Sequence, residues 1–174
     1  MSQEQVLELT GVFAARSVDH WLVGGWGVDA LLGVQTRPHK DLDLLIRLED
    51  VAKTIRLLEA RGFNFAYAWP ESRWLEGVKP RPTAFVMTHP DGRELDFHAI
   101  RFDADGTPHP QWRTDWDLTA VDLTGGSIGG VDVRCTTADR QLRDHATYEM
   151  PPDHARDMEL LRKAFRHERQ PERP

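Results

Sequence analysis

The chain has 174 residues, 40% of them hydrophobic, so it can form one domain with a buried core, or one domain with a small helical appendage. Its formal net charge is −6 and its basic residues do not gather in one run, which excludes the dense basic patch that tight, non-specific nucleic-acid binding requires. Cys135 is the single cysteine, which excludes a disulfide framework and a cysteine zinc site. The N-terminus lacks the pattern of a secretory signal, and no segment approaches the roughly 20 apolar residues of a membrane span. We therefore expect a cytoplasmic protein without a nucleic-acid or membrane partner.

Hydrophobic periodicity predicts that helices and strands alternate in the first half of the chain. Glycines mark several ends: Gly24-Gly25 follows the first strand, Gly33 ends the second helix and Gly62 ends the third. In chain order the expected elements are a helix over 3–17, a strand over 21–23, a helix over 26–32, a strand from about 41, a helix over 50–61 and a strand over 63–69.

The second half begins with an irregular, proline-containing loop and then returns to strands and helices. We assign residues 1–135 to the main domain and residues 136–174 to C-terminal helices packed on it, with a frayed tail from about residue 167. A glycine-rich run lacks the Lys-Ser/Thr ending of a phosphate loop, so it is predicted to be a hairpin turn. The expected elements are a loop over 70–82, a hairpin over 83–101 with its turn at 89–92, a polar loop over 102–110, a segment over 112–123 that continues into a strand, a glycine turn over 125–130, a strand over 131–134, a helix to about 148 and a last helix from 153.

The stretch from the first glycine pair to the second strand has the features of a phosphate and metal site. Gly24 and Gly25 leave room for a phosphate beside the backbone, and the helix that follows directs unpaired N–H groups to the same place. Asp41 and Asp43 lie two residues apart on a strand, so both carboxylates leave one face of the sheet. Magnesium would explain two carboxylates within an apolar strand, because it prefers hard oxygen ligands and keeps positions for phosphate and water.

A second polar face lies on the later arm of the expected hairpin. Glu94, Asp96 and His98 alternate with apolar residues, so they share one surface of that strand. Exposure to solvent is a sufficient explanation of this pattern on its own.

The motifs Gly24-Gly25-Trp26-Gly27-Val28-Asp29 and Arg37-x-His39-x-Asp41-Leu42-Asp43 resemble the signature of small antibiotic nucleotidyltransferases. These are the lincosamide and aminoglycoside 2''-type enzymes of the DNA polymerase β-like superfamily. Every fixed position of G-G-W-x-x-D and of R-x-H-x-D-[hydrophobic]-D is matched, and Asp96-Phe97-His98 matches a third motif, D-[hydrophobic]-H. The resemblance covers residues 18–100 well and the C-terminal helices loosely.

The resemblance implies an α+β fold of the polymerase β-like type, with a mixed sheet flanked by helices and a small C-terminal helical part. It also implies magnesium-dependent transfer of a nucleoside monophosphate, with ATP as the expected donor, to a hydroxyl of a small antibiotic, with release of pyrophosphate. Asp41, Asp43 and Asp96 would hold one or two magnesium ions. Asp96 would also be the general base, with Glu94 as the second candidate.

Several neighbouring residues keep two interpretations each. Arg37 and Lys40 are assigned to phosphate contact, together with the backbone at Gly24 and Gly25, with simple solvated charge as the alternative. The expected partners are the nucleotide and a small-molecule acceptor, and the chain is expected to be a monomer or a homodimer. Other residues have alternative roles as well: His39 in ordering the loop, Asp29 in bracing the glycine turn and Trp26 in the core. His145 and Tyr148 either pack against the protein or line the pocket.

The acceptor is suggested by aromatic and acidic residues in or beside loops. Aromatic walls with carboxylates suit a sugar-bearing amine, and the short C-terminal part is nearer the lincosamide type. Two other functions remain: a nucleotidyltransferase that modifies a protein partner, as in some toxin–antitoxin pairs, and a nucleotide-binding protein without catalysis. The nucleotidyltransferases that modify a protein partner usually have G-S-x-A-R after the first strand, a pattern that this chain lacks. The residues proposed for the acceptor are Trp69, Trp74, Trp112 and Trp116, with Glu71, Glu76, Asp103, Asp105, Asp115 and Asp117.

Overall fold

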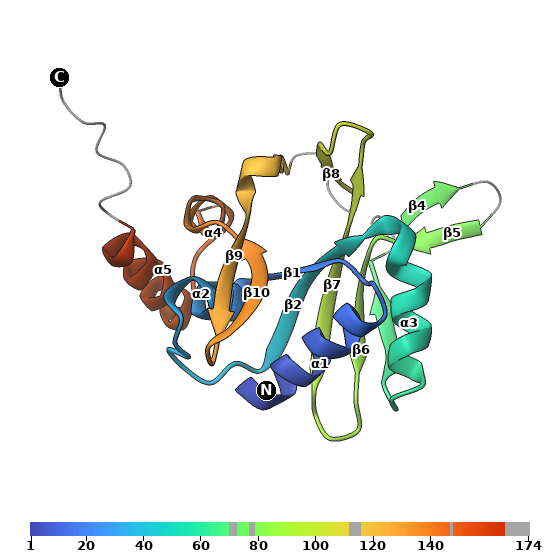
Figure 1. Ribbon diagram of the computed structural model, residues 1–174, viewed down its shortest axis with the longest axis horizontal. Helices are drawn as coiled ribbons and strands as arrows, with labels where there is room; N and C mark the ends of the chain where they lie inside the picture. Colours follow the sequence, from blue (N-terminus) through green and yellow to red (C-terminus); the bar gives the residue numbers. More distant parts are fainter. Residues whose placement is uncertain (70–72, 77–78, 112–115, 147, 166–174) are drawn as a thin grey trace.

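A computed structural model describes residues 1–69, 73–76, 79–111, 116–146 and 148–165 of the chain, with the backbone alone over 73–76 and 79–81 (Figure 1). One mixed sheet dominates the fold, and helices flank it. The helices are α1 (Gln3–Ala15), α2 (Gly24–Leu32), α3 (Val51–Glu59), α4 (Ala138–His145) and α5 (Pro152–Ala164), with 3-10 turns η1 (Leu48–Asp50) and η2 (Ala120–Asp122). The strands are β1 (His20–Val23), β2 (Asp41–Arg47), β3 (Asn64–Ala68), β4 (Arg73–Glu76), β5 (Lys79–Pro82), β6 (Ala84–Thr88), β7 (Glu94–Phe102), β8 (Pro108–Pro110), β9 (Leu123–Ile128) and β10 (Val131–Thr136).

The main sheet has the strand order β3-β6-β7-β2-β1-β10-β9, with β8 paired to β7. Its centre is parallel in two places, because β2 runs parallel to β7 and β1 runs parallel to β10, while the other neighbours are antiparallel. The β2–β7 pairing brings together strands that are far apart in the sequence. The predicted α+β class with a mixed, helix-flanked sheet is thus observed.

The two faces of the sheet have different roles because strand side chains alternate. On one face, α1 and α3 cover an apolar core that includes Phe13, Leu44 and Phe97 (Figure 1). On the other face, Trp21 and Leu45 belong to a smaller apolar cluster. Every second residue of β2, starting at its first, points to this second face, which therefore receives the carboxylates.

The C-terminal helices pack at the end of α2. Met158 and Leu161 of α5 are fully buried and form an apolar cluster with Val28 of α2 and Ala138 of α4. A buried polar contact adds to it, because Arg37 reaches Asp157 of α5. None of the helices in the described ranges is long and apolar enough to span a bilayer.

Several element boundaries differ from the sequence prediction. The segment 70–82 is not wholly irregular, because β4 and β5 form a two-stranded hairpin apart from the main sheet. The turn of the last hairpin is Gly129-Gly130 alone, whereas Gly125 and Gly126 lie within β9. A Cβ on Gly126 would lie 2.5 Å from the carbonyl oxygen of Ala30, so glycine at this position lets α2 pack directly on the strand. Helix α4 ends at His145, three residues before the expected end.

Candidate active site

Four acidic side chains lie along the paired strands β2 and β7. The parallel register places Asp43 opposite Asp96 and Asp41 opposite Glu94. Because directly paired residues point to the same face, the two strands form a double row of carboxylates at the centre of the sheet. The three carboxylates expected to bind metal therefore lie on one face of two neighbouring strands, and so does the second candidate base.

The electrostatics of this row favour protonated carboxyl groups in the metal-free protein. Burial is the largest cause that raises the pKa of Asp96 to about 7, and the charges of Asp41 and Glu94 contribute to the same rise. Burial also raises the pKa of Asp43 well above its ordinary value, with the neighbouring carboxylates adding to the effect. Moreover, the buried Oδ1 atom of Asp96 accepts no hydrogen bond. Carboxylates that repel one another, with a buried oxygen that accepts no hydrogen bond, have the chemistry of a cation site.

The described residues do not form a closed metal cage. No three His, Cys, Asp or Glu side chains within these ranges converge around one position in the arrangement of a metal site. The donors nevertheless fit magnesium, because that ion takes one or two carboxylates and fills its other positions with water and phosphate oxygens. Asp43 and Asp96, on neighbouring strands, supply such a pair.

The first turn of α2 lies against the same carboxylates. Gly24 has φ +57°, and a Cβ there would lie 2.2 Å from Oδ2 of Asp43. Glycine is therefore required at Gly24 both for the left-handed backbone and for the approach of the carboxylate. The helix begins at Gly24, two residues earlier than predicted, so its unpaired N–H groups start next to Asp43. A triphosphate bound by a metal at Asp43 would be within reach of this helix N-terminus.

A buried histidine–aspartate pair joins α2 to the loop before β2. His39 donates from Nε2 to Oδ2 of Asp29 at 2.5 Å, and both side chains are almost fully buried. Asp29 also accepts from the backbone N–H of Thr36 at 3.0 Å and from its hydroxyl at 2.7 Å. The ring of His39 lies 4.9 Å from that of Trp26, and Nδ1 lies 2.2 Å from where a Cβ of Gly25 would be. His39 and Asp29 thus order the loop that leads to β2, and Trp26 is a core residue.

The two basic residues ahead of Asp41 have carboxylate partners. Arg37 donates to both oxygens of Asp157, from Nε at 3.1 and 3.3 Å and from Nη2 at 2.8 Å. Lys40 is exposed and its Nζ lies 3.2 Å from Oε1 of Glu94, which brings it to the edge of the carboxylate row. Lys40 is therefore beside the proposed phosphate position, whereas Arg37 holds α5 in place.

A cavity of about 500 Å³ opens on the face of the sheet that carries the carboxylates. Gly24 and Asp43 line it, together with three aromatic side chains, Trp69, Trp116 and Tyr148. His145 and Tyr148 line the cavity, and they also pack on each other with ring centres 5.8 Å apart, so both interpretations given for them apply. The other described lining residues are Val23, Leu45, Ala84, His98, Gln141, Asp144 and His154.

Sequence reasoning missed most of the contribution of α4 and α5 to this cavity. Gln141 donates to the hydroxyl of Thr136 at 3.0 Å, and its Nε2 occupies the space where Gly27 would carry a Cβ. Asp144 contacts Arg140 and Trp116, and His154 contacts the hydroxyl of Tyr148 at 2.7 Å. The sequence signal that could have indicated this contribution is the helical spacing of the polar residues in α4. The acceptor candidates Glu71, Trp112 and Asp115, and the side chains of Trp74 and Glu76, lie outside the described part of the chain.

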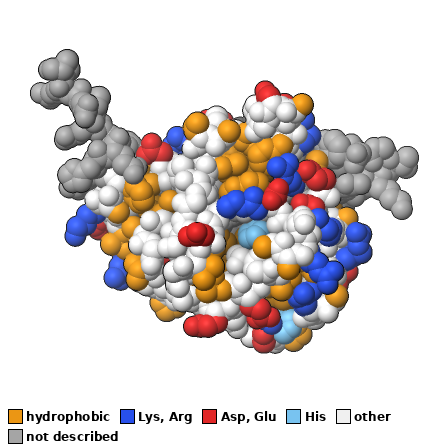
Figure 2. Space-filling view, in the orientation of Figure 1, with side chains coloured by type: hydrophobic (Ala, Val, Ile, Leu, Met, Phe, Trp, Pro, Cys, Tyr) orange, Lys and Arg blue, Asp and Glu red, His pale blue; other side chains and the backbone are white. Residues whose placement is uncertain are grey.

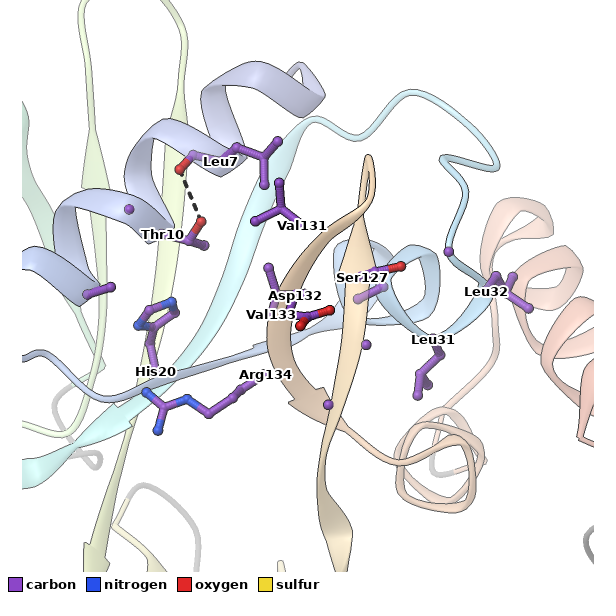
Figure 3. A pocket seen from close by; sticks show the side chains of 16 residues that line it. Leu7, Thr10, His20, Leu31, Leu32, Ser127, Val131, Asp132, Val133 and Arg134 are labelled. Carbon is purple, nitrogen blue, oxygen red and sulfur yellow. Dashed lines mark hydrogen bonds between the residues drawn. The ribbon is translucent and has the colours of Figure 1, made fainter.

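A larger cavity, about 1060 Å³, lies elsewhere and has a different character. It lies between α1, the end of α2 and the β9–β10 hairpin, where Leu7, Leu31 and Val133 contribute apolar surface (Figure 3). Two of its polar side chains are satisfied locally: Thr10 donates to carbonyl groups of its own helix, and His20 donates from Nδ1 to the carbonyl of Val18. Figure 2 shows a patch of hydrophobic side chains near the middle of the face in view, with charged side chains around it.

Comparisons with known proteins agree with this geometry. A model of the aminoglycoside-2''-adenylyltransferase family matches residues 5–161. A lincosamide resistance protein from Staphylococcus haemolyticus is 25% identical over 158 residues, which are 86% of this chain and 88% of the relative.

Solved structures show the same fold. The lincosamide antibiotic adenylyltransferase LnuA, solved with lincomycin bound, superposes with a TM-score of 0.79 at 23% identity, over 93% of this chain and 97% of that chain. ANT(2'')-Ia in complex with adenylyl-2''-tobramycin gives a TM-score of 0.70 at 20% identity, over 97% of this chain and 98% of that chain. The fold and the family expected from the glycine and aspartate motifs are confirmed. The chain belongs to the aminoglycoside-2''-adenylyltransferase family.

Proposed function

We propose that this enzyme transfers AMP from ATP to a hydroxyl of a small amine- or sugar-containing antibiotic, such as a lincosamide or an aminoglycoside, and releases pyrophosphate. The observation that carries the proposal is the pairing of Asp43 with Asp96 beside the first turn of α2, where Asp43 lines a cavity with aromatic walls. Membership of an adenylyltransferase family supports the same reaction.

At the α-phosphorus the reaction forms one bond to oxygen and breaks another. The acceptor oxygen attacks the α-phosphorus, its proton passes to a carboxylate, and the bond from the α-phosphorus to the bridging oxygen breaks as pyrophosphate leaves with the electron pair. Asp96 is the proposed base, because its Oδ1 accepts no hydrogen bond and it lies opposite Asp43 on the neighbouring strand. Glu94 is the weaker candidate, since Lys40 already contacts its carboxylate.

Magnesium is the proposed cation of the carboxylate row. Asp43 and Asp96 would hold it, with Asp41 beside them on β2. The ion supplies charge stabilisation for the attacking and leaving oxygens. The protein's own part is to hold the two strands in register and to keep the glycine turn against Asp43.

For the phosphates we propose contacts from the backbone at Gly24 and Gly25 and from Lys40. The N-terminus of α2 directs N–H groups toward the carboxylates, and Lys40 adds a mobile positive charge at their edge. Arg37 could contact a phosphate only by leaving Asp157, so we assign it mainly to the attachment of α5. We further propose that the protein acts in the cytoplasm as a monomer or homodimer.

The test is pyrophosphate release with magnesium and each nucleoside triphosphate, measured with lincosamides and aminoglycosides as acceptors. Asp43→Asn and Asp96→Asn are expected to lower kcat by about 10²–10⁴-fold, the range for loss of a general base. Glu59→Gln, an exposed carboxylate at the end of α3, is the matched control and should leave the rate unchanged. ATP binding without release for every acceptor would refute antibiotic modification, and no nucleotide binding at all would refute the enzyme function.

A further inference from the structure

One histidine of the cavity wall is held in place by a backbone carbonyl group. His145 is the last residue of α4, and its Nδ1 atom lies 2.8 Å from the carbonyl oxygen of Gln141. Because a carbonyl oxygen can only accept a hydrogen bond, Nδ1 carries the ring proton and donates it. In the neutral ring the other nitrogen, Nε2, therefore has a lone pair and can only accept a hydrogen bond.

The Nε2 atom of His145 opens on the cavity. His145 is one of the lining residues. Within the described ranges Nε2 has no hydrogen-bond partner, yet it is not among the polar atoms that the protein encloses without a partner. A molecule bound in the cavity thus meets a hydrogen-bond acceptor whose orientation is fixed by the helix behind it.

Two further rings stand beside this nitrogen, and we call His145, Tyr148 and His154 the aromatic corner. The ring centre of His145 lies 5.8 Å from that of Tyr148 and 5.3 Å from that of His154. The hydroxyl of Tyr148 lies 2.7 Å from Nδ1 of His154, which joins the first turn of α5 to the segment after α4. Tyr148 is 46% exposed, so part of its ring surface remains open for a flat base to stack on.

The aromatic corner lies on the same side of the carboxylate row as the proposed phosphate position. Gln141, whose carbonyl group holds His145, also fills the space of the missing Cβ of Gly27 in the glycine turn of α2. Burial raises the pKa of Tyr148, and the charge of Asp43 contributes to the same rise, which places the ring within electrostatic range of that carboxylate. A triphosphate at the N-terminus of α2 would therefore extend its nucleoside toward the aromatic corner.

We propose that the aromatic corner binds the base of the nucleoside triphosphate, and that Nε2 of His145 selects adenine by accepting a hydrogen bond from its 6-amino group. Guanine carries a carbonyl oxygen at this position, and two acceptors that face each other leave both without a donor. The inference rests on the proposed adenylyl transfer and names a specificity-determining residue of that same site. If His145 only capped α4, the enzyme would owe no preference among bases to this residue.

The experiment compares ATP with purine riboside triphosphate, which keeps the purine ring but lacks the 6-amino group. Dissociation constants are measured by calorimetry at pH 8 with magnesium and without an acceptor. The wild-type protein is expected to bind ATP about three- to tenfold more tightly, the range for one neutral hydrogen bond, and to bind GTP no better than purine riboside triphosphate. Equal binding of ATP and purine riboside triphosphate would overturn the inference.

Two variants of His145 separate the structural nitrogen from the one in the cavity. His145→Asn places an amide near the position of Nδ1, so it keeps a donor for Gln141 and loses the acceptor. His145→Gln places an amide oxygen near the position of Nε2 and loses the contact with Gln141. The asparagine variant should lose the preference for ATP at a nearly unchanged Tm, whereas the glutamine variant should keep the preference and melt at a lower temperature. An asparagine variant with the preference of the wild-type protein would overturn the inference.

A matched control and a second measurement complete the test. His109→Asn makes the same change on β8, at a half-exposed histidine that pairs with Asp103, and should leave the preference for ATP unchanged. Pyrophosphate release with an acceptor is measured separately. Selective ATP binding without release would refute the proposed transfer and leave the inference standing. Release by a wild-type protein that does not distinguish the two nucleotides would do the reverse, and binding of neither nucleotide would overturn both.

Discussion

The carboxylate row should make the metal-free protein less stable as the pH rises, and Asp96→Asn should remove part of that effect. Burial and the neighbouring charges raise the pKa of Asp96 from 3.8 to about 7 in the folded state. Between these two values the folded protein binds a proton that the unfolded chain releases, so the free energy of unfolding falls as the pH rises through this window. The contribution of Asp96 to the free energy of unfolding is fully present below about pH 4 and is lost above about pH 7.

The magnitude follows from the size of the shift. A difference of about three pKa units corresponds to about 4 kcal/mol, which is an upper limit because the Asp96 side chain is 25% exposed and partly screened. Even about 1 kcal/mol would change Tm by roughly 2–4 °C in a chain of this length. Asparagine keeps the shape of the side chain without the charge, so at pH 8 the variant should melt at a higher temperature than the wild-type protein.

The assay is thermal unfolding by circular dichroism in EDTA at pH 5 and at pH 8. The two proteins should differ less in melting temperature at pH 5 than at pH 8, because only part of the window between pKa 3.8 and about 7 lies below pH 5. Magnesium should stabilise the wild-type protein and have less effect on the variant. Glu59→Gln controls for the removal of one negative charge from the surface. Equal melting temperatures of wild type and Asp96→Asn at pH 8 in EDTA would refute the reasoning.

Three further changes test other contacts. Gly24→Ala places a Cβ against Oδ2 of Asp43 at a left-handed backbone position, so we expect a loss of about 1–3 kcal/mol in urea unfolding and a rate loss that saturating magnesium does not restore. Asp29→Ala leaves His39 buried without its carboxylate, and should destabilise by about 1–3 kcal/mol, whereas Asp29→Asn, which can still accept, should cost less; equal losses would contradict a hydrogen-bonding role. Cys135 is fully buried and its thiol has a pKa raised to about 12 by burial, so a thiol reagent should react with it only after unfolding, and rapid labelling under native conditions would disprove this.

The sequence predicts the order of the elements well where local patterns decide it. Alternation along residues 93–101 and the glycine that ends α2 are local signals, and both are observed. The pairing of Asp43 with Asp96 could not be obtained in this way, because a parallel neighbour is chosen by the whole sheet and not by either strand. The family motifs supplied that information, because they assign Asp43 and Asp96 to the same site in the folded family members.

Long-range contacts explain where the local interpretation was incomplete. In the sequence Arg37 looks like a free basic residue shortly before β2. In the structure it pairs with Asp157, which lies 120 residues further along the chain. Gly125 and Gly126 look like a turn, but α2 packs so closely on this strand that a Cβ at Gly126 would meet Ala30. In both cases the residue type is explained by a contact with an element that is distant in the sequence. The neighbouring residues in the sequence do not reveal that contact.

The glycines of the G-G-W-G motif illustrate the same principle at the site itself. At each glycine the space of the missing Cβ is taken by a side chain from another part of the chain: Gly24 by Asp43, Gly25 by His39 and Gly27 by Gln141. These three side chains come from β2, from the loop before it and from α4, which lines the cavity with aromatic walls. The first turn of α2 is therefore the point where the proposed metal site, its supporting loop and the proposed acceptor cavity meet. A side chain at any of these glycines would separate α2 from one of them, which explains in physical terms why so short a motif can indicate a complete active site.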